Sequence, residues 1–402
     1  MIKKLIGLIL ILCSLSCGKK SSGNTAEDGV TVYAPVAVQK TVNKKVFVHI
    51  MPWFETPASN NGVWGLHWRM NNKNPNLILP NGQRDIASHY YPLIGPYASG
   101  DANVIEYQLL LMKLSGIDGV YIDWPGIQQL NDYPLLVSNT LKIVALLDKV
   151  GLNFAIVYED QNLPAGNAIP TAQADMNYLQ NNFFVKSNYE KQNGKPLLLV
   201  FGPQKITNAA DWNTVFSVLP VSPSFFTLWY ESSEAPAAGE FAWVYMNNIS
   251  DLTGFYSNGY TGIKMGSAYP GFNSYYAPGG WMGPTWVIPH DNGNGDLGTF
   301  QQTVDLAISQ PSVNYIQLVT WNDYGEGTNI EPTKEFGYGF LTSLQQRLGV
   351  AFNEADLEMI AKLYQQRIDK AGDTAIQKKL DQAFYFIVSL RIAEAHSILD
   401  TL

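Results

Sequence analysis

Cysteine is scarce in this chain, and its scarcity limits the available chemistry. The 402 residues include two cysteines, Cys13 and Cys17, both close to the amino terminus. After position 17 the sequence therefore offers no disulfide, no thiolate nucleophile and no cysteine-based metal site. Any chemistry of the folded part has to come from carboxylates, hydroxyls, imidazoles, amides or aromatic rings.

Charge is sparse as well. Charged residues make up 15% of the chain, the net charge is -8, and no cluster of lysine and arginine stands out. Nucleic-acid binding needs clustered basic side chains that displace counterions, so this partner class is excluded. A glycine-rich phosphate loop and a serine nucleophile elbow are both missing. The polar run 291–296 lacks the ligand spacing of an EF-hand, so we expect neither a metal nor a cofactor.

Long apolar runs are also missing, and the longest one is Leu5–Leu12, which follows Lys3 and Lys4. This run is too short to span a bilayer, and a basic start followed by a short apolar segment is typical of a secretory signal. The run leads into Ser14–Gly18, which resembles a bacterial lipobox with Cys17 as the lipidated residue. Plain secretion with an incidental cysteine is the alternative.

These signals predict a lipoprotein signal peptide over 1–17 and a flexible tether over 18–43, where small and polar residues dominate. We expect a protein of the bacterial cell envelope, periplasmic or on the outer-membrane surface, that contacts the membrane only through its amino-terminal lipid.

Aromatic residues are abundant, at 12% of the chain, with 10 Trp and 22 Tyr. Some of these rings must fill a core. Flat, largely apolar rings also suit a cleft that stacks them against the faces of sugars. Composition alone leaves both interpretations open.

From Lys45 onward, short apolar runs alternate with helix-like stretches. This alternation is typical of a parallel sheet covered by helices, and eight such runs indicate closure into a barrel. The strands are expected at Val46–Trp53, Gly119–Trp124, Asn153–Tyr158, Pro196–Phe201, Phe226–Tyr230, Phe241–Met246, Gly262–Ala268 and Tyr315–Trp321. We predict the α/β class, as a (β/α)8 TIM barrel over 44–345. A C-terminal helical extension over 346–402 is expected to pack on the barrel, with helices at Asn353–Lys370 and Thr374–Leu399.

Acidic and aromatic side chains recur where the predicted strands end. In a barrel all these ends meet at one face, where active sites are built. We expect substrate contacts from Trp53, Asp123, Trp124, Tyr158, Glu159, Asp160 and Trp229. Further candidates from the loops are His89, Tyr90, Trp286 and His290. For each residue the alternative is structural: core packing for a ring, a salt bridge or helix cap for an acid, and an internal hydrogen bond for a histidine.

The last predicted strand leads into the run Trp321–Glu331, where Asp323 and Glu326 lie three residues apart. Hydrolysis of a glycosidic bond needs one protonated carboxyl for the leaving oxygen and one carboxylate on the other side of the sugar. Packing against aromatic rings raises the pKa of one acid by desolvation. We therefore predict Asp323 and Glu326 as the catalytic pair, with Trp321, Asn322 and Tyr324 as neighbouring substrate contacts.

The segment Trp321–Pro332 resembles the signature shared by glycoside hydrolase family 99 (endo-α-mannosidases and α-mannanases) and family 71 (endo-α-1,3-glucanases). Upstream, His89–Tyr97 and Leu114–Val120 are similar to family 99. The resemblance implies that Glu326 is the acid/base. In family 99 the first acid of the motif is Glu, which assists the substrate's own 2-hydroxyl in a retaining mechanism. Asp323 is closer to the inverting family 71, so stereochemistry and the choice between mannose and glucose stay open.

Taken together, the residues and the resemblance predict a glycoside hydrolase that is endo-acting on an α-linked mannan, glucan or glycan. The alternative is a non-catalytic glycan-binding lipoprotein of the cell envelope. A glycan-processing enzyme other than a hydrolase is disfavoured by the signal peptide, because activated sugar donors are cytoplasmic.

Overall fold

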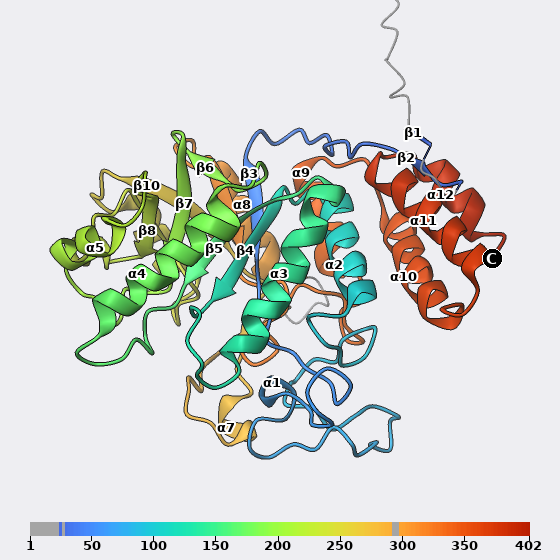
Figure 1. Cartoon of the computed structure of the whole chain (residues 1–402), viewed down its shortest axis with the longest axis horizontal. Coiled ribbons are helices and arrows are strands. Elements are labelled where there is room, and N and C mark those ends of the chain that lie inside the picture. Colours follow the sequence, from blue (N-terminus) through green and yellow to red (C-terminus); the bar gives the residue numbers. More distant parts are fainter. Residues whose placement is uncertain (1–23, 26–28, 292–296) are drawn as a thin grey trace, which may run out of the picture.

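The computed structural model describes residues 24–25, 29–291 and 297–402, and its centre is a closed parallel barrel (Figure 1). Within these residues the barrel strands are β3 (Lys45–Ile50), β4 (Gly119–Trp124), β5 (Asn153–Tyr158), β7 (Lys195–Val200), β8 (Ser224–Leu228), β9 (Gly239–Phe241), β10 (Ile263–Ala268) and β13 (Tyr315–Leu318). Each pairs in parallel with the next, β5 pairs with β7, and β13 pairs with β3 to close the ring. The predicted (β/α)8 barrel is confirmed.

The strands form because nearly every residue in them is apolar and buried. β4 is buried throughout, and β5 and β7 are buried after their first residue, which is the pattern of strands covered on both faces. The register sets Trp124 opposite Tyr158 at the carboxyl ends of β4 and β5. The residues that follow these strands therefore emerge side by side.

The strands predicted to end at Trp53, Met246 and Trp321 end earlier, at Ile50, Phe241 and Leu318. In these three places the chain leaves the parallel ladder and enters the loops of the barrel mouth. The last predicted residues of these three strands therefore belong to loops and not to the sheet.

Helices cover the outside of the barrel. They are α2 (Ala102–Leu114), α3 (Tyr133–Val150), α4 (Ala168–Leu179), α5 (Ala209–Phe216), α6 (Ile249–Ser257), α8 (Gly298–Ser309) and α9 (Gly339–Leu348). A π-helical turn, η1 (Gln180–Phe184), extends α4. Asp101 caps α2 by accepting the backbone N–H groups of Asn103 and Val104.

Two long loops lie side by side at the carboxyl-end face of the barrel. The connection from β3 to α2 contains α1 (Leu66–Arg69), and the connection from β10 to α8 contains α7 (Tyr276–Gly279). Figure 1 shows both short helices below the barrel. The side chain of Asn71 donates to the carbonyl of Gly280 at 2.8 Å, which joins the two loops. The remaining short elements are β1 (Asn24–Thr25), β2 (Thr31–Val32), β6 (Lys191–Gln192), η2 (Ser232–Glu234), β11 (Phe272–Asn273) and β12 (Val287–Ile288).

Residues 29–43 correct the prediction of a flexible tether. This segment runs along the face of the barrel opposite α1 and α7 (Figure 1). The N–H of Val36 donates to Val388 O at 2.9 Å, and the N–H of Thr41 donates to Leu348 O at 3.0 Å. Both acceptors are the last residues of helices, whose terminal carbonyls have no partner within the helix. The segment is held because it satisfies them. The predicted signal peptide, Cys17, 18–23 and 26–28 lie outside the described residues.

Three helices follow the barrel: α10 (Glu354–Asp369), α11 (Thr374–Val388) and α12 (Ile392–Leu399). The side chain of Asn353 starts α10 in a capping box with Asp356. The single helix expected over Thr374–Leu399 is wrong, because the chain breaks at Leu390, which has a φ of 60°. A left-handed residue cannot continue a right-handed helix, so α12 folds back beside α11.

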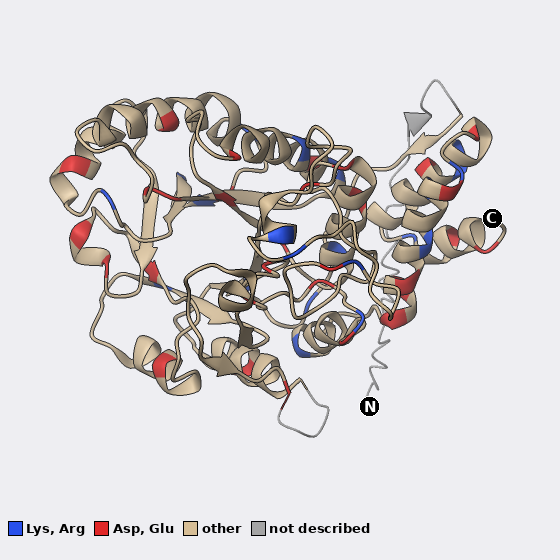
Figure 2. Cartoon of the chain, turned by 90° about the horizontal axis from the view of Figure 1, so that it is seen from below, with Lys and Arg blue, Asp and Glu red and all other residues tan. Residues whose placement is uncertain are grey.

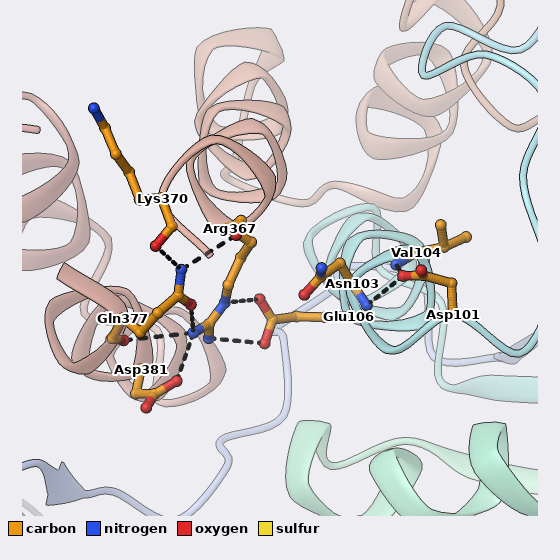
Figure 3. A network of polar contacts seen from close by, with 8 residues as sticks. All are labelled: Asp101, Asn103, Val104, Glu106, Arg367, Lys370, Gln377 and Asp381. Carbon is orange, nitrogen blue, oxygen red and sulfur yellow. Dashed lines mark hydrogen bonds and ion pairs between the residues drawn. The ribbon is translucent and has the colours of Figure 1, made fainter. Parts of the chain in front are cut away.

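A buried ion pair joins these helices to the barrel. Arg367 of α10 makes a bidentate contact with Glu106 of α2, with both N···O distances at 3.0 Å (Figure 3). The same guanidinium contacts Asp381 of α11 at 2.6 Å. Arg367 is only 9% exposed, so its charge depends on these partners.

Within the described residues, no helix is long and apolar enough to cross a membrane.

Replacing Arg367 by Met should lower the free energy of unfolding by about 3–5 kcal/mol, because it leaves the Glu106 carboxylate buried without a counter-charge. Urea unfolding measures the change. The double variant Arg367→Met with Glu106→Gln removes both charges and should recover much of the loss. An equal loss in the single and double variants would show that packing, not the buried charge, carries the effect.

Candidate functional site

Four carboxylic acids meet at the carboxyl ends of the barrel strands. Asp123 belongs to β4, Glu159 directly follows β5, and Asp323 and Glu326 lie on the loop after β13. Their charges act on one another, and Asp123 is hydrogen-bonded to Glu159. Figure 2, seen from the side of α1 and α7, shows acidic positions on the ribbon around the barrel axis. The structure thus brings together four of the acids predicted from the sequence.

The loop that carries Asp323 and Glu326 is folded tightly on itself. The Asp323 carboxylate accepts the N–H of Glu326 at 2.9 Å. The backbone N–H of Asp323 donates to Thr320 Oγ1 at 2.8 Å. The N–H of Thr328 donates to Asp323 O at 3.2 Å, and Gly327 turns the chain with a φ of 66°. The two acids therefore have defined positions before any substrate binds.

Burial separates the proton affinities of this pair. Desolvation raises the pKa of Asp323 to about 6, and the N–H groups of Glu326 and Gly325 limit the rise. Desolvation and then the charge of Asp323 raise the pKa of Glu326 to about 8. At neutral pH Glu326 therefore holds a proton while Asp323 is ionised, which are the states of a general acid and a base.

Asp123 and Glu159 form a second pair beside the first. Burial and the adjacent Glu159 carboxylate raise the pKa of Asp123 well above its ordinary value. Burial also raises the pKa of Glu159, while the hydrogen bond from Asp123 lowers it. Asp123 is therefore the protonated partner and donates to Glu159, which reduces the repulsion among the four acids.

Trp243 is a site residue that the sequence analysis missed. Its indole N–H donates to Glu326 Oε2 at 3.3 Å. The ring packs edge-on against His49, with centroids 4.9 Å apart, and against Phe201, also at 4.9 Å. Trp243 lies within the predicted strand Phe241–Met246, so the strand ends could have suggested it.

Tyr276 of α7 is the second missed residue. After burial, the charges of all four acids raise the pKa of its hydroxyl well above the ordinary value, which places it over the carboxylate cluster. A Cβ at Gly325 would lie 3.0 Å from the Tyr276 ring, so the ring lies directly on the loop that carries Asp323 and Glu326. Tyr276 belongs to a stretch rich in Gly, Asn and Tyr without periodicity, and no sequence signal distinguished it.

Glu331 is buried and supports the loop that carries Asp323 and Glu326. Its carboxyl group is 1% exposed and accepts four hydrogen bonds. The donors and distances are Tyr97 Oη at 2.7 Å, Gln108 Nε2 at 2.7 Å, Tyr324 Oη at 2.8 Å and Trp321 Nε1 at 3.2 Å. Because Trp321 and Tyr324 flank Asp323, this buried group holds the backbone that carries the candidate base. Desolvation raises the pKa of Glu331 to about 7.

Several predicted substrate contacts are core residues instead. Trp124, Trp321 and Tyr324 are fully buried. Tyr158 is also buried and donates its hydroxyl to Asp175 Oδ2 at 2.7 Å. Their rings fill the space beneath the mouth, because a side chain at a strand end can point either to the cleft or back into the barrel layers.

Asp160 and Asn322 are likewise structural. The Asp160 carboxylate accepts three backbone N–H groups from 204–206, each at 2.8 Å, and so holds the loop after β7. The Asn322 amide accepts from Met51 N at 2.8 Å and donates to Met51 O at 3.0 Å, which joins the loops after β13 and β3. Both side chains are therefore engaged in hydrogen bonds within the protein.

The two predicted histidines differ from each other. His290 is buried, and burial lowers its pKa to about 4, so its ring is neutral. Its Nε2–H donates to Gly327 O at 2.7 Å, and its Nδ1 accepts the Tyr90 hydroxyl at 3.0 Å. His290 and Tyr90 thus support the loop that carries Asp323 and Glu326. His89 is exposed and reaches Ser274 O at 3.4 Å.

The remaining predicted tryptophans lie around the mouth. Trp53 is half-buried and stacks on His67, with ring centroids 4.2 Å apart. Trp229 is buried beneath Tyr230. Trp286 stacks on Phe272 at 4.1 Å. Of these, Trp53 and Trp286 retain partly exposed faces.

In the described part of the chain, no group of three or more His, Cys, Asp or Glu side chains is arranged to hold a metal ion. Among the four acids of the mouth, Asp123 and Glu159 are joined by a side-chain hydrogen bond.

Comparison with known proteins supports the barrel assignment. No family model and no curated protein matches the sequence. Among solved structures, the chain is similar to the GH99 endo-α-mannosidase from Bacteroides thetaiotaomicron in complex with BIS-TRIS-propane. The TM-score is 0.59 at 18% identity, over 80% of this chain and 99% of that chain. A second structure of that enzyme gives a TM-score of 0.58 at 18% identity, over 77% and 97%.

A glycoside hydrolase-like protein has a TM-score of 0.56 at 12% identity, over 79% of this chain and 98% of that chain. At these identities the likeness shows the fold alone. The predicted resemblance to family 99 is therefore confirmed at the level of a shared glycoside hydrolase-like barrel.

Replacing Glu331 by Gln should change how stability depends on pH. The folded pKa of about 7 lies above the ordinary value of 4.5, so the native protein retains a proton that the unfolded chain has released. Native stability therefore falls as the pH rises through this window, by about 2–3 kcal/mol between pH 5 and pH 8 for this group. Urea unfolding at both pH values should show a smaller fall in Glu331→Gln. The exposed Glu358→Gln is the matched control, and an unchanged pH dependence in Glu331→Gln would contradict the assignment.

Proposed function

We propose that the protein is a glycoside hydrolase that uses Glu326 as general acid and Asp323 as the assisting carboxylate. The observation that carries the proposal is the separation of the two pKa values, to about 8 and about 6, on one rigid loop at the barrel mouth. Active sites of such barrels lie at this face. The glycoside hydrolase-like fold supports a glycan as the substrate class.

In the proposed reaction the Glu326 carboxyl gives its proton to the glycosidic oxygen while the bond from that oxygen to the anomeric carbon breaks. Asp323 takes a proton from the attacking oxygen as this oxygen bonds to the anomeric carbon. The attacking oxygen belongs either to water, which completes hydrolysis, or to the sugar's own 2-hydroxyl. In the second case water then opens the resulting 1,2-anhydro sugar at the anomeric carbon and Glu326 takes back a proton from that water. The Trp243 indole N–H orients the Glu326 carboxyl at 3.3 Å. Glu159 is positioned to accept hydrogen bonds from sugar hydroxyls, and Asp123 keeps Glu159 in place.

The proposed substrate is an α-linked mannan, glucan or related glycan that is cut within the chain. The similarity of the motif after β13 to families 99 and 71 supports this choice, as does the likeness of the barrel to a GH99 endo-α-mannosidase. A glycan-binding protein without activity is the competing function, and the same experiment separates the two.

Wild-type protein should release reducing ends from α-mannan or α-1,3-glucan, and Glu326→Gln should lower the rate by about 10²–10⁴-fold, the usual contribution of a general acid. Glu358→Gln, on the exposed face of α10, is the control and should match the wild type. The kcat/KM of the wild type should be highest between pH 6 and 8, since Asp323 must be ionised and Glu326 protonated. The anomer first released, followed by NMR, distinguishes retention from inversion. Tight glycan binding by the wild type and by Glu326→Gln, without release of reducing ends by either, would support the binding function instead.

We also propose that Cys17 carries the lipid that attaches the protein to the cell envelope. The apolar run Leu5–Leu12 followed by Ser14–Gly18, which resembles a bacterial lipobox, supports this proposal. Cys17→Ser should move the protein from the membrane fraction to the soluble fraction while the activity per molecule stays unchanged. An unchanged membrane fraction for Cys17→Ser would show that the cysteine is not the anchor.

A further inference from the structure

Tyr230 has two unfavourable features at once. It follows β8 at the rim of the mouth, its ring is 70% exposed, and its backbone has a φ of 75°. A non-glycine residue in the left-handed region is destabilised by roughly 1–2 kcal/mol, and bulky residues are rare there. Strain of this kind concentrates at binding and catalytic sites. The fold therefore holds a large ring in solvent by means of a strained backbone.

The ring is supported from below. Tyr230 stacks on Trp229, with centroids 4.1 Å apart and planes inclined by 21°. Trp229 is 7% exposed and packs against Phe255 of α6 and edge-on against Tyr245. Stacking on a buried tryptophan limits the movement of the Tyr230 ring, so its outer face is a fixed, flat, apolar surface.

This surface and the carboxylate cluster adjoin the same buried hydrophobic cluster. Trp243 and Tyr245, both on the connection from β9 to α6, pack against the buried cluster that contains Trp229. Trp243 is also the residue that donates to Glu326. One hydrophobic cluster therefore packs against Trp243, which contacts the proposed general acid, and contains Trp229, which supports the exposed Tyr230 ring.

The charges around the ring restrict what can cover it. Glu231 directly follows Tyr230, and it is close enough to Glu234 and Glu240 for their charges to raise its pKa after desolvation. An anionic partner would be repelled here. A neutral sugar suits the position, because one face of a pyranose ring is apolar and its hydroxyls can donate to nearby carboxylates.

We propose that Tyr230, stacked on Trp229, is an outlying binding position for a sugar unit of a neutral glycan chain that extends from the cleft across the ends of β8 and β9. The inference rests on the proposed function for the identity of the cleft. It specifies a polymer, not a short oligosaccharide, as the substrate.

The test measures binding to soluble α-mannan and to α-1,3-glucan by affinity electrophoresis, in a Glu326→Gln background that prevents turnover. Tyr230→Asn removes the ring and also relieves the backbone, since Asn tolerates a positive φ. It should weaken polymer binding by about 10-fold, the equivalent of about 1.4 kcal/mol, with a melting temperature equal to or above that of the parent. Tyr230→Phe keeps the ring and should bind like the parent. A disaccharide from the same polymer should bind both variants equally.

Equal polymer binding by the Tyr230→Asn variant and its parent would overturn the inference, as would no binding of either polymer or an equal loss for the disaccharide. A Tyr230-dependent affinity in a protein whose wild type hydrolyses neither polymer would leave the inference standing and remove the proposed hydrolysis. Hydrolysis by the wild type, together with unchanged polymer binding in the Tyr230→Asn variant, would keep the proposed hydrolysis and remove the inference.

Discussion

The buried carboxyl of Glu331 ties together the parts of the chain that build the mouth. Its four donors come from the connection after β3, from α2 and from the loop after β13. A carboxyl group in a low-dielectric interior is tolerated only with such partners, so the surrounding elements can adopt few other arrangements. The proposed catalytic loop is therefore positioned from behind, by groups that never meet the substrate.

Desolvation raises the pKa values of Glu331, Asp323 and Glu326 by different amounts. Glu331 is surrounded by four donors, and Asp323 accepts N–H groups of its own loop, which limits the rise in its pKa. Glu326 has the indole of Trp243 at 3.3 Å and faces the charge of Asp323, and its pKa rises furthest of the three, to about 8. The supply of hydrogen-bond donors, together with the adjacent charge, sets the different proton affinities of Asp323 and Glu326 on which their proposed roles as base and acid rest.

Local pattern was sufficient for the eight barrel strands and for the four acids that meet at their ends. The eight barrel strands were recognisable because strands buried on both faces read as continuous apolar runs between amphipathic helices. Asp123, Glu159, Asp323 and Glu326 were recognisable because the ends of parallel strands must meet at one face. Local pattern was insufficient for the rings: Trp124, Trp321 and Tyr324 turned into the core, whereas Trp243 and Tyr276, which were not singled out, contact the cluster.

The sequence by itself determined the barrel, the face on which the acids gather and the loop that carries the proposed catalytic pair, because these depend on the order of apolar and polar residues along the chain. Only the tertiary structure decided which rings face the cleft, which acid keeps its proton and how residues 29–43 are held. Those outcomes depend on contacts between residues far apart in sequence, such as Glu331 with Tyr97 or Val36 with Val388, and no local pattern records them.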